Sequence, residues 1–274
     1  MNVLRNARGV LIEPRGTHCP VSEFLELRTY GLPSRPALIY LPGLHGDWTI
    51  IGGFRRALGE CVRFVEMNYP RTLTWSLDDY ASAIVAGLRA NGVEHGWLLG
   101  ESFGSQIGWA MLARGDFAVD GVILAGGFVR HPSRLGVQLV TGLAGGIPLN
   151  WLVRILFGYA HIKQFRYRHS VEAMNAIREF LARRTELDRQ AAKHRLGLVA
   201  RYDPSAIARQ ARVPIYALTG AFDPVVPWWP VRRWLRKNCP ALRDYKVIWP
   251  AEHNVLSGAP EATAQLVLQW MGLG

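Results

Sequence analysis

Cysteine is scarce in this sequence. The 274 residues include three, Cys19, Cys61 and Cys239, which lie far apart and follow no metal-ligand spacing. A scattered, odd-numbered set argues against a disulfide framework and against a zinc site of the usual pattern. We therefore expect no bound metal and a reducing, cytoplasmic setting.

Long apolar runs are also rare. Charges interrupt residues 1–8, so we expect no signal peptide. One uncharged stretch covers residues 136–153, which is close to the length of a short membrane span. Three polar side chains, four glycines and a proline interrupt it. We interpret it as two short helices that line an apolar pocket, and contact with a membrane surface is the alternative.

Lysine is scarce: only four of the 32 basic residues are lysine, and the others are arginine. The net charge is +11. Residues 130–212 hold 15 Lys and Arg against 5 Asp and Glu, so this segment carries nearly all of the excess. Two interpretations stay open. The segment could form a basic surface for anionic substrates, acyl carriers or acidic lipid, or the composition could reflect a general preference for arginine. Nothing resembles a nucleic-acid-binding module, so no nucleic-acid partner is expected.

Short apolar segments alternate with amphipathic ones in two parts of the chain. This alternation predicts an α/β fold with a mostly parallel, doubly wound sheet and right-handed crossovers. Ligands of such sheets bind beyond the carboxyl ends of the strands. The expected strands cover residues 10–13, 24–28, 37–41, 61–67, 97–99, 121–125, 213–219 and 245–249, and the expected helices cover 50–58, 77–90, 107–112, 231–237 and 260–271.

The alternation stops between residues 131 and 212, where the pattern turns helical. Residues 170–184 and 191–200 have the spacing of amphipathic helices. We therefore predict a core made of residues 1–130 and 213–274. A helical cap, residues 131–212, is inserted before the strand that carries the candidate acid.

The segment Gly100-Glu101-Ser102-Phe103-Gly104 matches the pattern G-x-S-x-G, the nucleophile elbow. An apolar strand precedes it and a helical pattern follows it, which is the context that the motif requires. Gly100 and Gly104 lack the side chains that would clash where strand and helix pass closely. Ser102 is therefore the candidate nucleophile, with a helix N-terminus facing any oxyanion that forms there.

A serine hydroxyl needs a base to accept its proton and an acid to orient that base. The expected chain order is nucleophile, acid, histidine. Asp223 lies in the turn just beyond the strand that ends near Thr219, and His253 follows the last strand directly. Ser102, Asp223 and His253 are thus predicted at one edge of the sheet, in the expected order.

Alternatives exist for both partners. Asp223 could be an ordinary turn residue, since Asp-Pro is a common turn pair, and His253 could be an exposed loop histidine. His45 is the one serious alternative base, because its loop faces the same edge. Among the other acids, Asp203 and Asp244 precede strands, and Glu252 is adjacent to His253 and is expected to point away from it.

An oxyanion needs two backbone N–H donors. The Phe103 amide directly follows the nucleophile. Leu44 lies in the Gly-rich loop Pro42–Gly46, which follows the strand of residues 37–41. We predict these two amides as the oxyanion hole. The alternative is that the loop is merely a tight turn between a strand and a helix.

These segments together resemble the α/β-hydrolase superfamily, in particular its capped, esterase-like members. The resemblance covers the chain from about residue 37 onward. It implies the nucleophile, acid and base roles for Ser102, Asp223 and His253, and the donor roles for Leu44 and Phe103. Two segments depart from the family pattern. Pro42-Gly43 stands where many relatives carry His-Gly, and Met67-Asn68-Tyr69-Pro70-Arg71 replaces an Asp-x-x-Gly-x-Gly-x-Ser turn.

We therefore predict a serine hydrolase that cleaves small carboxylic esters through an acyl-enzyme, without a cofactor. The open alternatives are a thioesterase or acyltransferase acting on anionic acyl carriers, a C–C hydrolase or lyase with the same side chains, and a non-catalytic binding protein. Apolar residues of the cap and the acid turn are expected to line the substrate pocket, or alternatively to serve in ordinary packing. They are Trp151, Leu152, Leu156, Phe157 and Trp228, with Tyr159 and Trp229 beside them.

Overall fold

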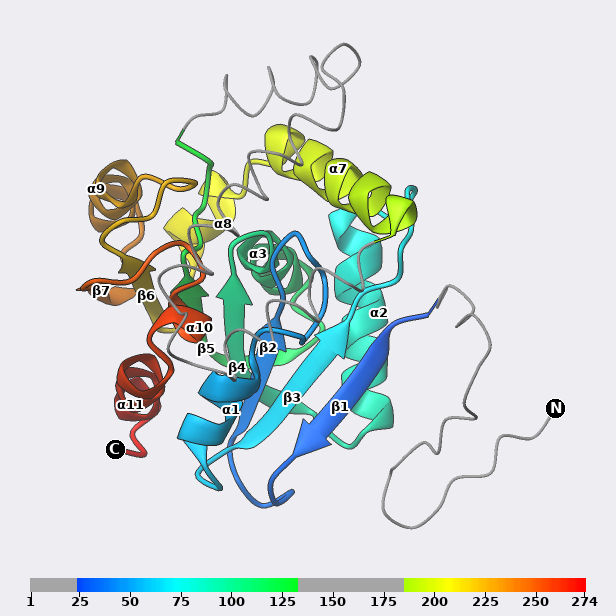
Figure 1. Cartoon of the computed structure of the whole chain (residues 1–274), viewed down its shortest axis with the longest axis horizontal. Helices are drawn as coiled ribbons and strands as arrows, with labels where there is room; N and C mark the ends of the chain where they lie inside the picture. The colour runs from blue at the N-terminus through cyan, green and yellow to red at the C-terminus, as the bar shows by residue number, and fades with distance from the viewer. Residues whose placement is uncertain (1–23, 133–184) are drawn as a thin grey trace, which may run out of the picture.

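The computed structural model describes residues 24–132 and 185–274 of the chain. Figure 1 shows a single twisted sheet with helices on both of its faces. Its seven strands follow the order β1-β3-β2-β4-β5-β6-β7. Only β1 is antiparallel to its neighbour, and every other pair is parallel. The strands are β1 (Glu26–Tyr30), β2 (Ala37–Leu41), β3 (Arg63–Asn68), β4 (His95–Glu101), β5 (Ala118–Ala125), β6 (Ile215–Gly220) and β7 (Leu242–Ile248).

The helices form two layers, one on each face of the sheet. Helices α1 and α11 pack together on one face, and α2, α3 and α8 cover the other. This is the doubly wound arrangement that the alternating pattern predicts. The described helices are α1 (Gly52–Leu58), α2 (Leu77–Ala90), α3 (Gly104–Arg114), α7 (Glu186–Arg201), α8 (Ser205–Gln210), α9 (Trp228–Asn238), α10 (Val255–Gly258) and α11 (Pro260–Trp270).

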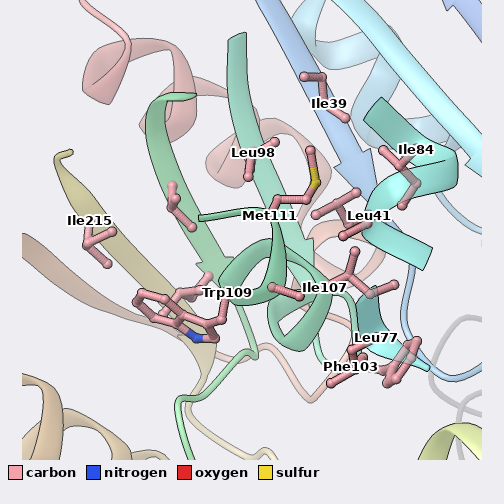
Figure 2. Packing of buried hydrophobic residues seen from close by; sticks show 14 of the residues in the cluster. Ile39, Leu41, Leu77, Ile84, Leu98, Phe103, Ile107, Trp109, Met111 and Ile215 are labelled. Carbon is pink, nitrogen blue, oxygen red and sulfur yellow. The ribbon is translucent and has the colours of Figure 1, made fainter. Parts of the chain in front are cut away.

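The central strands are buried on both faces, as a parallel sheet between two helical layers requires. In β2 all five residues are buried, and they alternate between the two cores. Ile39 and Leu41 face the α2 and α3 side, whereas Leu38 and Tyr40 face the α1 and α11 side. Figure 2 shows the first of these clusters, where β2, β4 and α3 meet. Burial of this apolar surface is the main stabilising contribution to the fold.

Local signals place several helix ends. Ser76 and Asp79 form a capping box at the start of α2, where the sequence predicts it. Thr185 and Asp188 form a second box, so α7 begins before residue 191, the expected start. Helix α9 begins at Trp228, three residues before its expected start, and β1 lies two residues after its expected position.

Part of what the sequence predicts falls outside the described residues. The strand at residues 10–13, the helix at 170–184 and the uncharged stretch 136–153 lie there. Of the predicted cap, the described part contains α7 and α8. Within residues 24–132 and 185–274, none of the helices combines the length and apolar character needed to cross a membrane.

Candidate active site

A sharp turn joins β4 to α3 and has Ser102 at its tip. Ser102 has φ 50° and is the one non-glycine residue with a positive φ in the described part of the chain. Such a conformation costs roughly 1–3 kcal/mol and is found mostly at functional sites. The glycines of the motif make the turn possible. A Cβ at position 100 would lie 2.8 Å from the Ser105 Cα, and one at position 104 would overlap the Leu41 carbonyl oxygen.

The loop after β6 holds Asp223 in a fixed orientation. The Asp223 Oδ1 atom accepts hydrogen bonds from the backbone N–H groups of Val225 and Val226, both at 2.9 Å. The Asp223 side chain is fully buried. Its second oxygen, Oδ2, is thereby aimed at the loop that follows β7.

His253 connects this carboxylate to the serine. The His253 Nδ1 atom lies 2.7 Å from Asp223 Oδ2, and the Nε2 atom lies 2.9 Å from Ser102 Oγ. Because a carboxylate only accepts hydrogen bonds, Nδ1 carries the ring proton and the Nε2 lone pair faces the serine hydroxyl. All three residues are buried, so little water competes for these bonds. Such a series can withdraw the serine proton as the oxygen attacks an electrophile.

The alternative partners lie elsewhere. His45 lies in the Pro42–Gly46 loop with its ring beside Gly43, and the ring hydrogen-bonded to Ser102 is that of His253. Asp203 pairs with Arg130, and its Oδ1 accepts the Ser205 amide. The remaining acid, Asp244, accepts a hydrogen bond from the Trp270 indole N–H.

The two predicted oxyanion donors lie where the strands end. Phe103 is the N-cap residue of α3, and Leu44 lies in the loop after β2. Neither backbone amide donates a hydrogen bond to another described residue. Both are therefore available to an external acceptor.

Tyr69, at the end of β3, anchors the loop that carries Leu44. Its backbone N–H donates to the Gly46 carbonyl at 2.7 Å, and its hydroxyl donates to the Pro42 carbonyl at 3.3 Å. Burial raises the pKa of Tyr69 well above its usual value. The phenol therefore stays protonated, and the anchor holds, throughout the neutral and mildly alkaline range.

Of the predicted pocket residues, Trp228 lies in the described part of the chain. It begins α9, five residues after Asp223, and it lines a shallow, open hollow on the surface of α9 that includes none of Ser102, Asp223 and His253. The other lining residues are Trp229, Arg232, Arg233, Arg236 and Lys237. Trp151, Leu152, Leu156 and Phe157 lie outside the described residues.

Sequence reasoning missed two features of the described structure. One is the basic face of α9, which lies outside the segment where the charge excess was found. The acid-free run from Trp228 to Lys237 was the signal that could have revealed it. The other is Arg195 of α7, which is buried against the Leu44 loop. No pattern distinguishes it from the exposed arginines around it.

Comparison with known proteins agrees with this fold. The family model described as "alpha/beta hydrolase fold" matches residues 8–260 of the chain. No curated protein matches the sequence. Many solved structures share the fold, at identities too low to transfer an activity.

Three of these structures illustrate the similarity. A hydrolase from Pseudomonas aeruginosa PA01 superposes with a TM-score of 0.75 at 16% identity, over 90% of this chain and 94% of that one. An enol-lactonase from Burkholderia xenovorans LB400 gives 0.74 at 17% identity, over 90% and 96%. A thermophilic esterase from Thermogutta terrifontis gives 0.71 at 18% identity, over 90% and 93%.

Proposed function

Because the chain belongs to the α/β-hydrolase family, we propose that it is a serine hydrolase that cleaves carboxylic esters through an acyl-enzyme. One observation carries the proposal. The side chains of Ser102, His253 and Asp223 form a buried, hydrogen-bonded series at the carboxyl end of a parallel sheet. Esterases and a lactonase among the structural neighbours agree with this reaction class.

The first half-reaction is the acylation of Ser102. As Oγ attacks the ester carbonyl, His253 Nε2 takes its proton and the imidazole becomes a cation. Asp223, 2.7 Å from Nδ1, stabilises that cation and fixes the ring tautomer. The carbonyl oxygen gains negative charge and accepts hydrogen bonds from the Leu44 and Phe103 amides. When the tetrahedral intermediate collapses, the imidazolium returns its proton to the departing alkoxide.

The second half-reaction releases the acid. Water takes the place of the alcohol, and His253 accepts a proton from it as its oxygen attacks the acyl carbonyl. The C–O bond to Ser102 breaks, and Ser102 Oγ regains a proton from the imidazolium. Every step uses groups of this chain and water, so the proposal requires no cofactor.

A substrate panel tests the proposal. p-Nitrophenyl esters of graded chain length would be assayed beside acyl thioesters, on wild type and on Ser102→Ala. We expect ester hydrolysis in the wild type and its near-complete loss in the variant, with the thermal midpoint Tm preserved. Ser257→Ala is the matched control, since its hydroxyl donates to the Asn254 carbonyl and takes no part in the Ser102–His253–Asp223 series. Substantial ester turnover by Ser102→Ala would reject the mechanism.

The hollow beside α9 favours a second candidate, thioester hydrolysis on an anionic carrier. Four cationic side chains line it, and α9 contains no acidic residue. A phosphorylated carrier such as coenzyme A would be attracted to such a surface. The charge-reversal pair Arg233→Glu and Arg236→Glu would then raise KM for acyl-CoA, most strongly at low salt, and leave neutral esters unaffected. Equal effects on both substrates would remove this candidate.

A further inference from the structure

Arg195 is the most deeply buried arginine in the described part of the chain, at 2% exposure. It lies on α7 and reaches down to two loops that follow neighbouring strands. Its Nη1 atom donates to the Leu44 carbonyl at 2.9 Å, and its Nη2 atom donates to the Pro70 carbonyl at 3.0 Å. One guanidinium therefore links the loop after β2 to the loop after β3.

Aromatic rings complete the surroundings of this guanidinium. It lies 5.4 Å from the Tyr69 ring centroid and 6.0 Å from that of Tyr80, and Nε donates to the Tyr80 hydroxyl at 3.3 Å. Cation–π contacts and carbonyl hydrogen bonds offset part of the cost of burying a charge. No carboxylate of the described residues forms an ion pair with Arg195. Within residues 24–132 and 185–274, the guanidinium is therefore held next to the Leu44 loop by carbonyl, hydroxyl and ring contacts alone.

The neighbouring residues are arranged to admit this side chain. Gly46 has φ 77°, and a Cβ at that position would overlap the Arg195 guanidinium. Tyr69 donates a hydrogen bond to the Leu44 loop, and the Pro70 carbonyl accepts one from Arg195. The next residue, Arg71, pairs with Asp188 of α7 at 2.5 Å. The segment after β3, which departs from the family pattern, thus connects α7 to the Leu44 loop.

We propose that Arg195 is a positioning residue for ester hydrolysis, one that fixes the Leu44 amide for the developing oxyanion. This inference rests on the proposed function. The guanidinium fork holds the Leu44 carbonyl in place by one hydrogen bond and is itself anchored to the Pro70 carbonyl by the other. It thereby restricts the backbone conformation of Leu44, whose own N–H is the proposed donor to the substrate. Its buried positive charge also favours negative charge nearby, since buried electrostatic interactions are weakly screened. The fixed amide and the positive charge both interact more strongly with the oxyanion than with the neutral carbonyl oxygen, so they lower the barrier rather than tighten substrate binding.

The test compares Arg195→Met with Arg195→Lys. We expect Arg195→Met to lower kcat for a p-nitrophenyl ester by about 10- to 100-fold, somewhat less than the loss of a direct donor, with KM within about twofold. The affinity for a boronic acid, which mimics the tetrahedral intermediate, should fall by a similar factor, and that for the product acid should not. Arg195→Lys keeps the charge but loses the fork, so it should recover part of kcat.

Arg63→Met is the matched control. Arg63 also donates to two backbone carbonyls, those of Gly92 and Asn91, but at the opposite end of the sheet. It should leave kcat unchanged. Arg195→Met with wild-type kcat and boronate affinity would overturn the inference, as would equal losses in the two methionine variants. If Arg195→Met does not fold, an Arg195→Lys protein with unchanged kcat and boronate affinity overturns it.

The results expected if the chain is not a serine esterase differ from those expected if Arg195 alone has no positioning role. In that case Ser102→Ala keeps its esterase activity and a phosphonate does not label Ser102, whatever the Arg195 variants do. If the serine is labelled and required while Arg195→Met matches the wild type, the positioning role alone is rejected.

Discussion

Gly104 lies so close to Leu41 that a Cβ at position 104 would overlap the Leu41 carbonyl oxygen. The start of α3 is thus packed directly against the end of β2. The sharp turn at Ser102 can form because no side chain at position 104 separates the helix from the strand. Gly104→Ala must push strand and helix apart. We expect a loss of about 1–3 kcal/mol in the free energy of unfolding, and a fall in kcat as the serine leaves the His253 ring. Urea titration and ester kinetics measure the two effects.

Gly108→Ala is the control for that substitution. Gly108 lies one turn further along α3, where an added Cβ would be in ordinary contact, 3.7 Å from a Leu41 methyl group. Alanine should be neutral there, or stabilising by about 0.5–1 kcal/mol, because glycine is a poor helix former. Equal destabilisation by the two alanines would show that the close approach at Gly104 is not the cause.

Asp223→Asn tests the orienting carboxylate. An amide at this position would favour the wrong ring tautomer of His253, and we expect kcat to fall by about 10⁴ while the fold persists. The exposed pair His95–Asp120 offers a control with nearly the same geometry, at 2.8 Å. Asp120→Asn should leave kcat unchanged. Comparable losses in both variants would contradict the role of Asp223.

The capping carboxylate of α7 predicts a pH dependence of stability. Burial acts to raise the pKa of Asp188, but hydrogen bonds from Thr185 and Arg71 outweigh it, and the pKa lies below its usual value. A carboxyl with a depressed folded-state pKa stabilises the protein above its unfolded pKa of about 3.9. This contribution is lost as the pH falls through the folded-state pKa.

Asp188→Asn should therefore be less stable than the wild type at pH 7, by about 1.5–3 kcal/mol, and the difference should shrink toward zero at strongly acidic pH. Urea titrations across that range measure it. Asp78→Asn serves as the control, because Asp78 is exposed and solvent screens its pair with Arg114, so the stability should change far less and with little dependence on pH. A difference for Asp188→Asn that stays constant with pH would contradict the assignment.

The sequence predicted the fold well because its signals are local. The capping box at Ser76, the glycines around Ser102 and the buried run of β2 each act within a few residues, and topology then brings the strand ends to one edge. Asp223 and His253 could be proposed as partners of Ser102 for the same reason, since each lies in the loop just beyond a strand. Helix α7 begins five residues before its expected start because the capping box at Thr185 was not recognised.

Arg195 and Tyr69 could not be predicted in the same way. Their contacts join segments that are more than 20 residues apart along the chain, and the side chains are ordinary members of a helix and a strand end. Their burial depends on how α7 packs on the loops after β2 and β3. Such packing follows from the tertiary arrangement, and periodicity does not reveal it.

Covalent labelling tests the central claim most directly. The wild type, Ser102→Ala and His253→Ala would be treated with a fluorophosphonate, and the adduct would be located by peptide mass spectrometry. We expect one adduct on Ser102 in the wild type, none at that peptide in Ser102→Ala, and labelling slowed by orders of magnitude in His253→Ala. An unlabelled Ser102 in the folded wild type, or labelling at the same rate without His253, would contradict the account.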